Sequence, residues 1–136
     1  MEQNYCIFTL KGFEARINSL AVSPNGKYIV IGLSDNTLRI WQVGTGKNIK
    51  KLEGHSDEVN NVAITPDGNY ILSGSKDHTI KIWDSLTGLP LRTLEGHTKK
   101  VVSLSISPDG KLLVSAARDQ TVKLWQINPG KLMKTF

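Results

Sequence analysis

Short runs of β-branched and aromatic residues, separated by polar turn residues, follow one another along the whole chain. They are clearest in the middle, where residues 59–64, 70–75, 79–83 and 89–94 are typical of strands. Between the first two runs, Thr-Pro-Asp-Gly at 65–68 places proline at the second position of a type I turn, with glycine free to take a positive φ. Four short strands at this spacing predict an antiparallel meander.

Large side chains fall on both faces of these strands. Residues 70–72 and 80–83 show little of the alternation expected of a sheet with one face in water. A small sheet buried on both faces needs a neighbour on each side, and sheets stacked around an axis supply one. No segment with a helical period competes with this interpretation. The pattern therefore predicts an all-β protein built from β-propeller blades.

The pattern recurs three times at a period of 42 residues, without an insertion or a deletion. The period is marked by Trp41, Trp83 and Trp125, by Pro24, Pro66 and Pro108, by Asp35, Asp77 and Asp119, and by Gly12, Gly54 and Gly96. Such self-similarity indicates one supersecondary unit that cannot bury its apolar faces alone. We expect a single repeat segment over 1–136, with an outer strand at 1–10 and repeats at 11–52, 53–94 and 95–136.

The second and third repeats resemble the WD40 repeat signature. In the second repeat, the resemblance rests on Gly54-His55, Ser73-Gly74-Ser75-Lys76-Asp77 and Ile80-Lys81-Ile82-Trp83-Asp84. The third repeat has Gly96-His97 and equivalent runs at 115–119 and 122–125, with Gln126 in place of the final Asp. The resemblance covers essentially the whole chain. It implies WD40-type blades, namely three four-stranded antiparallel sheets with strands a to d ordered outwards from the axis, plus an extra N-terminal strand d.

The same resemblance implies a buried hydrogen-bond chain within each blade, formed by a His, a Ser or Thr, an Asp and the Trp. By position these residues are His55, Ser73, Asp77 and Trp83 in the second repeat, and His97, Ser115, Asp119 and Trp125 in the third. The first repeat departs from the pattern, with Phe13 and Ile31 in place of the His and the Ser. Losing one partner leaves a buried polar group without a hydrogen bond, which costs about 1–3 kcal/mol of stability. Losing both partners is close to neutral. We expect Trp41 to find another acceptor or to reach solvent.

The resemblance to WD40 propellers also implies an interaction platform. In that family it is most often the rim where the entry to strand a meets the b–c turn. In this chain the rim positions are Arg16, Asn18, Ser34, Glu58, Asn60, Lys76, Lys100, Val102 and Arg118. They differ from repeat to repeat while the framework stays fixed, as a recognition face on a rigid scaffold would. Surface positions also drift where nothing constrains them. The resemblance implies other proteins or peptides as partners.

The candidate catalytic and ligand-binding groups have structural interpretations. His55 and His97 occupy identical repeat positions, which favours a role in each blade over a metal site. Asp67 and Asp109 each lie in a Pro-Asp-Gly turn, where Asp is a turn former. The sequence has no phosphate-binding glycine loop, zinc-type Cys/His cluster or nucleophile elbow, and Cys6 is its one cysteine. We expect no catalytic, cofactor-binding or metal site.

The charge balance adds little to this picture. The chain has 17 Lys and Arg against 12 Asp and Glu, a net charge of +5. A nucleic-acid surface usually adds aromatics for stacking, but here the aromatics mostly recur at apolar repeat positions, so we interpret the lysines as charges on solvated strand edges. No apolar run approaches the roughly 20 residues of a membrane span. The lone cysteine and the absence of a signal-peptide pattern favour a cytoplasmic protein.

Three blades cannot close a ring. Left open, the array would expose two apolar blade faces and unpaired strand edges. Either the chain is part of a longer propeller, or identical chains complete it. Met1 and a last residue in phase with the repeat favour self-association, giving a six-bladed dimer or a nine-bladed trimer.

Residues 4–10 and 131–136 both read as a strand d for the last blade. The N-terminal strand of one subunit would pair with the last strand c of its neighbour, or the C-terminal strand would close the blade within the chain.

The predicted function is a non-catalytic protein–protein interaction scaffold. The alternatives are a structural or evolutionary building block, or a fragment of a larger propeller, without a dedicated partner, and a small-ligand or enzymatic propeller with a site in the central channel.

Overall fold

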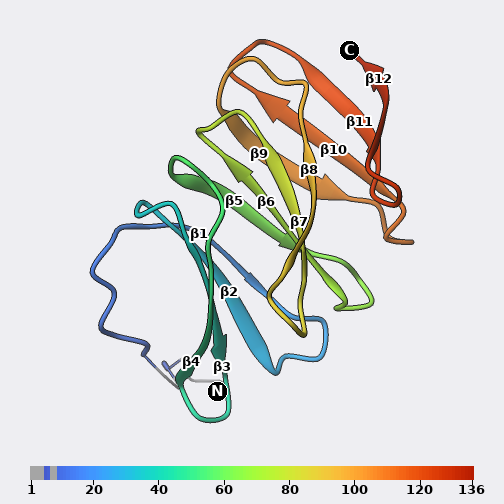
Figure 1. Cartoon of the computed structure of the whole chain (residues 1–136). Coiled ribbons are helices and arrows are strands. Elements are labelled where there is room, and N and C mark those ends of the chain that lie inside the picture. Colours follow the sequence, from blue (N-terminus) through green and yellow to red (C-terminus); the bar gives the residue numbers. More distant parts are fainter. Residues whose placement is uncertain (1–4, 7–8) are drawn as a thin grey trace.

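The computed structural model describes residues 5, 6 and 9–136. Its strands are β1 (Ile17–Val22), β2 (Tyr28–Leu33), β3 (Leu38–Gln42), β4 (Lys47–Leu52), β5 (Val59–Ile64), β6 (Tyr70–Ser75), β7 (Ile80–Asp84), β8 (Pro90–Leu94), β9 (Val101–Ile106), β10 (Leu112–Ala117), β11 (Val122–Gln126) and β12 (Lys131–Thr135). They form three four-stranded antiparallel sheets, each in chain order (Figure 1). The predicted all-β class and the three blades are confirmed.

The strands expected in the second repeat match the observed ones within one residue. β5 and β6 have the predicted bounds, while β7 and β8 begin one residue later, at Ile80 and Pro90. Thr79 falls in the preceding turn, because its backbone N–H is held by the Asp77 carboxylate at 2.9 Å. Neighbouring sheets contact each other through β1, β5 and β9, which places these first strands nearest the axis and the fourth strands outermost.

The two terminal segments behave differently. The predicted C-terminal strand is β12, which pairs with β11 and completes the third blade within the chain. The strand expected over 1–10 is not found in the part of it that the structure describes, since Tyr5, Cys6, Thr9 and Leu10 are not in a strand. The other six residues of that segment lie outside the described residues. The physical reason is that the expected partner is the third strand of a blade. β3, β7 and β11 are these third strands, and each already pairs with a strand on both of its edges.

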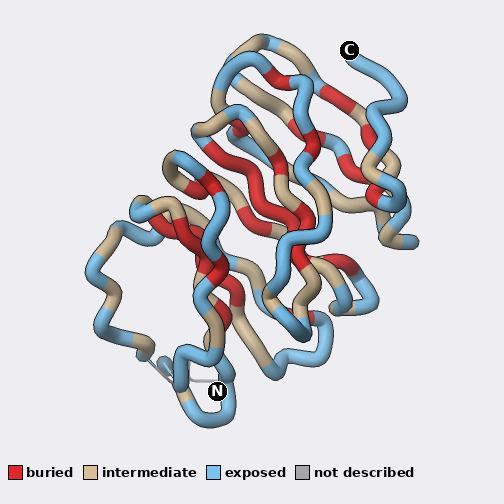
Figure 2. The backbone as a smooth tube through the Cα atoms, in the orientation of Figure 1, coloured by how far each residue is buried: buried red, intermediate tan, exposed pale blue. Residues whose placement is uncertain are grey.

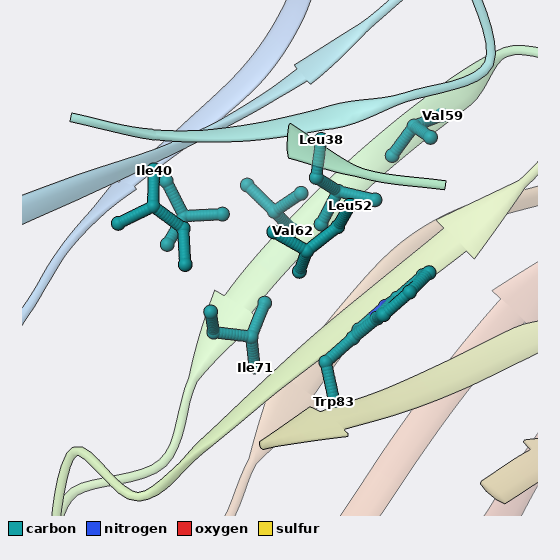
Figure 3. Packing of buried hydrophobic residues seen from close by; sticks show 8 residues of the cluster. Leu38, Ile40, Leu52, Val59, Val62, Ile71 and Trp83 are labelled. Carbon is teal, nitrogen blue, oxygen red and sulfur yellow. The ribbon is translucent and has the colours of Figure 1, made fainter. Parts of the chain in front are cut away.

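Two apolar layers hold the blades together, one on each side of the middle sheet. Figure 2 marks the buried residues along the strands. The first layer consists of Val30, Leu38, Ile40, Leu52, Val59, Val62, Ile71 and Trp83 (Figure 3). The second layer consists of Leu72, Ile80, Ile82, Leu94, Val101, Leu113, Trp125 and Ile127. The middle blade is thus buried on both faces, as the missing alternation in its strands predicts.

The blades approach so closely that two positions require glycine. A Cβ on Gly32 would lie 2.7 Å from Cγ1 of Val59, and a Cβ on Gly74 would lie 2.8 Å from Cγ1 of Val101. These valines are fully buried and come from the first strand of the following blade. The third repeat has Ala116 at the equivalent position, where no following blade is present.

The two ends of the array expose the positions that are buried between blades. The N-terminal end face consists of Ile17, Leu20, Val22, Ile29 and Trp41, and the C-terminal end face of Val114, Val122, Leu124 and Phe136. Leu20 is 61% exposed, whereas its repeat equivalent Val62 is 6% exposed. Val114 is 40% exposed, whereas its equivalents Val30 and Leu72 are fully buried.

No helix of the described residues is long and apolar enough to cross a membrane.

Candidate functional site

The polar framework of the second blade has the partners that the sequence predicts. Because an ionised carboxylate only accepts hydrogen bonds, Nδ1 of His55 donates to Oδ2 of Asp77 at 2.8 Å. Nε2 of His55 then accepts from the Ser73 hydroxyl at 2.6 Å. The same hydroxyl oxygen accepts from Nε1 of Trp83 at 2.8 Å. This chain links the segment before β5 to β6 and β7, and so fixes the entry to the blade.

The third blade repeats the framework with the same geometry. His97 lies 2.8 Å from Oδ2 of Asp119 and 2.7 Å from Oγ of Ser115, and Nε1 of Trp125 donates to that oxygen at 2.9 Å. Both His side chains are almost fully buried, at 0% and 1% exposure. Their second ring nitrogen is thus committed inside the blade. Neither imidazole is presented to solvent, where a metal ion or a substrate would have to reach it.

The framework has further members in Thr79 and Thr121, which the sequence analysis missed. Each threonine hydroxyl donates to Oδ1 of the Asp two residues before it, at 2.6 and 2.7 Å. Burial raises the pKa of Asp77, but the hydrogen bonds from His55 and Thr79 outweigh it and leave that pKa well below its ordinary value. The signal was present in the sequence, because Asp-x-Thr recurs at the same position in all three repeats.

The first blade lacks the framework, and the expectation for its tryptophan is wrong. The indole N–H of Trp41 neither reaches solvent nor has a hydrogen-bond partner among the described residues. Phe13 and Ile31 offer no acceptor, and the Phe13 ring packs on Trp41 with centroids 5.0 Å apart. A cavity of about 310 Å³ opens beside the pair, with Asp35 and Arg39 in its lining. An unpaired buried N–H of this kind costs about 1–3 kcal/mol.

Alanine at His97 and at Phe13 separates the two kinds of blade entry. His97→Ala is expected to cost about 1–3 kcal/mol, because it strands the buried groups of Ser115 and Asp119. Phe13→Ala is expected to cost about 1–2 kcal/mol through lost packing on Trp41 alone. Urea unfolding followed by circular dichroism measures both. Negligible losses at both sites would contradict this account of the blade entries.

The predicted interaction face lies at the edge where the first strands begin and the second and third strands turn. Its nine predicted positions are Arg16, Asn18, Ser34, Glu58, Asn60, Lys76, Lys100, Val102 and Arg118. Backbone bonds join the two loops of each blade, from Ser34 N to Arg16 O, from Lys76 N to Glu58 O and from Arg118 N to Lys100 O, each at 2.9 Å. The blade frame therefore brings these positions together in pairs.

Three of the face positions are bulge residues. Asn18, Asn60 and Val102 have no partner across the ladder of the first and second strands of their blades. A bulge re-aims the side chain of the extra residue. Here the amides of Asn18 and Asn60 donate to the backbone oxygens of Val59 and Val101 in the next blade, at 3.1 and 3.2 Å. These two residues thus join blades, a role that the sequence analysis did not assign to them.

Three charged groups on the face, from the first and second blades, form a compact cluster. Arg16 donates to Oε1 of Glu58 at 2.6 Å, and Nζ of Lys76 lies 3.8 Å from Oε2 of the same carboxylate. Asn18 accepts from Nε of Arg16 at 3.1 Å. Lys99 is an exposed cation next to Lys100 on the face and was not among the predicted face positions. Its position beside a face residue was the signal available.

Nothing in this face resembles a reaction centre. Among the described residues, no group of three or more His, Cys, Asp or Glu side chains could hold a metal ion. Asp67 and Asp109, the other carboxylate pair considered, accept hydrogen bonds from Thr65 and Ser107 within their own turns, at 2.6 Å each. They lie at the a–b turns, at the opposite edge of the blades from the interaction face. The face is suited to binding by hydrogen bonds and charge.

Comparison with known proteins agrees with this geometry. The family model described as "WD domain, G-beta repeat" (WD40) matches residues 4–42, 46–84 and 88–126. The structure titled "Structure of U3-55K" superposes with a TM-score of 0.90 at 28% identity, covering 93% of this chain and 41% of that one. The "Crystal structure of RRP9 WD40 repeats" gives the same TM-score at 29% identity, covering 93% and 40%.

Curated relatives match over much shorter lengths. The ribosome biogenesis protein ERB1 of Yarrowia lipolytica is 36% identical over 44 residues, which is 32% of this chain and 5% of the relative. The BOP1 homolog of Oryza sativa subsp. japonica is 42% identical over 45 residues, 33% of this chain and 7% of the relative. The chain therefore spans about two fifths of the similar solved chains and less than a tenth of these relatives.

Proposed function

The chain belongs to the WD40 repeat family, and on that premise we propose that it is a non-catalytic scaffold for protein–protein interaction, with its blades completed into a closed propeller by further copies of itself. Proteins of this family are generally non-catalytic scaffolds. The observation that carries the proposal is the contrast between a fixed buried framework and a variable face. The framework repeats its bonds within 0.1 Å in the second and third blades, while two of the three face positions in each blade change chemical type between them.

The names of the relatives do not assign a pathway to this chain. They are named for ribosome biogenesis, but each matches this chain over about the length of one repeat. The repeated WD40 framework accounts for a match of that length. A cytoplasmic location is part of the same proposal, since a single cysteine makes no internal disulfide and suits a reducing compartment.

The completion of the ring rests on the two end faces. Each end face consists of repeat positions that are buried or partly buried wherever a blade packs against them, and apolar patches of this kind mark interaction sites. The C-terminal end face of one copy would accept the N-terminal end face of the next, in the same orientation as the blade junctions within the chain. Such a head-to-tail contact closes into a ring when the rotation allows it. A dimer then has six blades and a trimer nine.

The junction between copies would be weaker than the junctions within the chain. Ala116 stands where Gly32 and Gly74 make room for a valine, and Ile17 stands where Val59 and Val101 supply it. Val102 replaces Asn18 and Asn60 and cannot donate a hydrogen bond across the junction. The alternative is that this chain is part of a longer propeller, which is favoured by similar solved chains of which it covers about two fifths.

Charge reversal on the interaction face tests the scaffold proposal. We expect a protein captured on the full chain, identified and then purified, to lose at least tenfold in affinity when Arg16, Lys76, Lys100 and Arg118 are changed to Glu. The physical reason is that rim charges set complementarity with a partner. The matched control reverses four lysines at the opposite edge, namely Lys27, Lys47, Lys111 and Lys131. A partner that binds both variants equally would overturn the face assignment, and a chain that binds no protein would overturn the scaffold role.

A further inference from the structure

Charge is distributed very unevenly over the interaction face. Three positions in each blade carry it: the two residues before the first strand and the first residue after the second strand. They are Ala15, Arg16 and Ser34 in the first blade, Asp57, Glu58 and Lys76 in the second, and Lys99, Lys100 and Arg118 in the third. The first blade has one cation, the second two carboxylates and one cation, and the third three cations. The two positions that are acidic in the second blade are both lysine in the third.

Three of the charges in the first two blades compensate one another within the chain: Arg16, Glu58 and Lys76. The Glu58 carboxylate takes a 2.6 Å hydrogen bond from Arg16 and lies 3.8 Å from the Lys76 ammonium. Its side chain is 21% exposed, so it is held against the surface between its two cations. A partner that approaches these three residues meets charges that already have counterparts.

The third blade has no such compensation. None of Lys99, Lys100 and Arg118, here called the basic cluster, forms an ion pair with any residue that the structure describes. Their loops are held together, because the backbone N–H of Arg118 donates to the carbonyl of Lys100 at 2.9 Å. The neighbouring carboxylate of Asp119 is committed to His97, Thr98 and Thr121. The three cations therefore lie on two loops that a backbone hydrogen bond joins, and none of them has an ion-pair partner among the described residues.

We propose that the basic cluster binds an acidic segment of the partner protein, a deepening that rests on the proposed scaffold function. A carboxylate accepts two parallel hydrogen bonds from an arginine, and adjacent lysines add charge attraction. A single exposed ion pair contributes little, about 0–1 kcal/mol, so the segment needs several carboxylates. The partner is thus a short acidic peptide stretch with its charges concentrated over the third blade.

Two features favour a peptide over a nucleic acid. A phosphate backbone running on across the face would meet the carboxylates of Asp57 and Glu58 in the next blade. Single-stranded nucleic acid also gains much of its affinity from stacking on aromatic side chains. Neither the nine face positions nor Lys99 is aromatic. The charge pattern therefore suits a ligand whose negative charge is short and local.

The test gives the third blade the acidic pair of the second. In the full chain, Lys99→Asp and Lys100→Glu place at these positions the residues that the second blade already accommodates. The control, Lys27→Asp with Lys111→Glu, changes net charge equally at the opposite edge. The probes are a fluorescein-labelled decapeptide of Glu and Gly, its Gln and Gly counterpart, and a labelled oligonucleotide, each titrated by anisotropy at 50 and 150 mM salt.

We expect the Glu peptide to bind the wild-type chain and the control alike, to bind the cluster variant at least tenfold more weakly, and to outbind the Gln peptide. Equal weakening in the control variant would overturn the inference, because the attraction would then follow net charge alone. Tighter binding of the oligonucleotide through the same residues would overturn it in favour of nucleic acid. A captured partner that binds the face but carries no acidic segment would contradict this inference, while the scaffold proposal would remain supported.

Discussion

Trp83→Ala is expected to lower the free energy of unfolding by about 3–5 kcal/mol, the range for removing a large aromatic side chain from a core. Trp83 is fully buried between the first and second blades, in the same layer as Leu52 and Ile71. The substitution also removes the donor that holds the Ser73 hydroxyl. It therefore empties one blade junction and breaks one polar framework.

Phenylalanine at two tryptophans isolates the framework from the packing. Trp83→Phe is expected to cost about 1–3 kcal/mol, because the buried Ser73 oxygen loses its donor. Trp41→Phe is expected to be neutral or stabilising, since its N–H is buried and has no partner among the described residues. Urea unfolding followed by far-ultraviolet circular dichroism measures both, and avoids the change in tryptophan fluorescence. An equal cost at both positions would contradict the difference between the blades.

Val30→Ala and Val114→Ala are expected to differ strongly although they remove the same atoms at the same repeat position. Val30 is fully buried between the first two blades, and Val114 on the C-terminal end face is 40% exposed. We expect Val30→Ala to cost about 2 kcal/mol, from lost burial plus the cavity left behind. Val114→Ala is expected to cost less than about 0.5 kcal/mol in a single dilute chain, as surface substitutions usually do.

Association changes that comparison. In the proposed assembly another chain covers the C-terminal end face and makes Val114 a junction residue, so Val114→Ala is expected to weaken assembly without weakening the fold. Unfolding at two protein concentrations, an order of magnitude apart, separates the two effects. A cost at Val114 that equals the cost at Val30 in isolated chains would show that this face is already buried within one copy, contrary to the structure.

The fold was predictable because several independent sequence features indicate each blade. The strands of the second repeat could be assigned from β-branched runs and from the turn at 65–68, since local chemistry determines both. The buried middle sheet could be assigned from 70–72 and 80–83, where apolar residues occupy both faces. Repetition then carried each assignment to the other two blades, and His55 and His97 found their expected partners.

What the sequence did not predict depends on distances between blades. The orphaned N–H of Trp41 results from the position of Phe13 against it, which no pattern specifies. Glu58 compensates charges from Arg16 in another blade and Lys76 in its own, so the charge map of the face emerges only in three dimensions. The strand expected at 1–10 is absent from the part of it that the structure describes, because β11, the third strand of the last blade, is already paired with β10 and β12.

The most direct test of the account is the mass of the full chain in solution, measured by light scattering over a range of concentrations. The account predicts two or three times the 15.0 kDa of one chain, with the assembly dissociating on dilution. Ala116→Gly, which makes the room that Gly32 and Gly74 make within the chain, is expected to move that dissociation to lower concentration. A mass of 15.0 kDa at every concentration, with or without that change, would contradict the claim that copies of this chain complete the propeller.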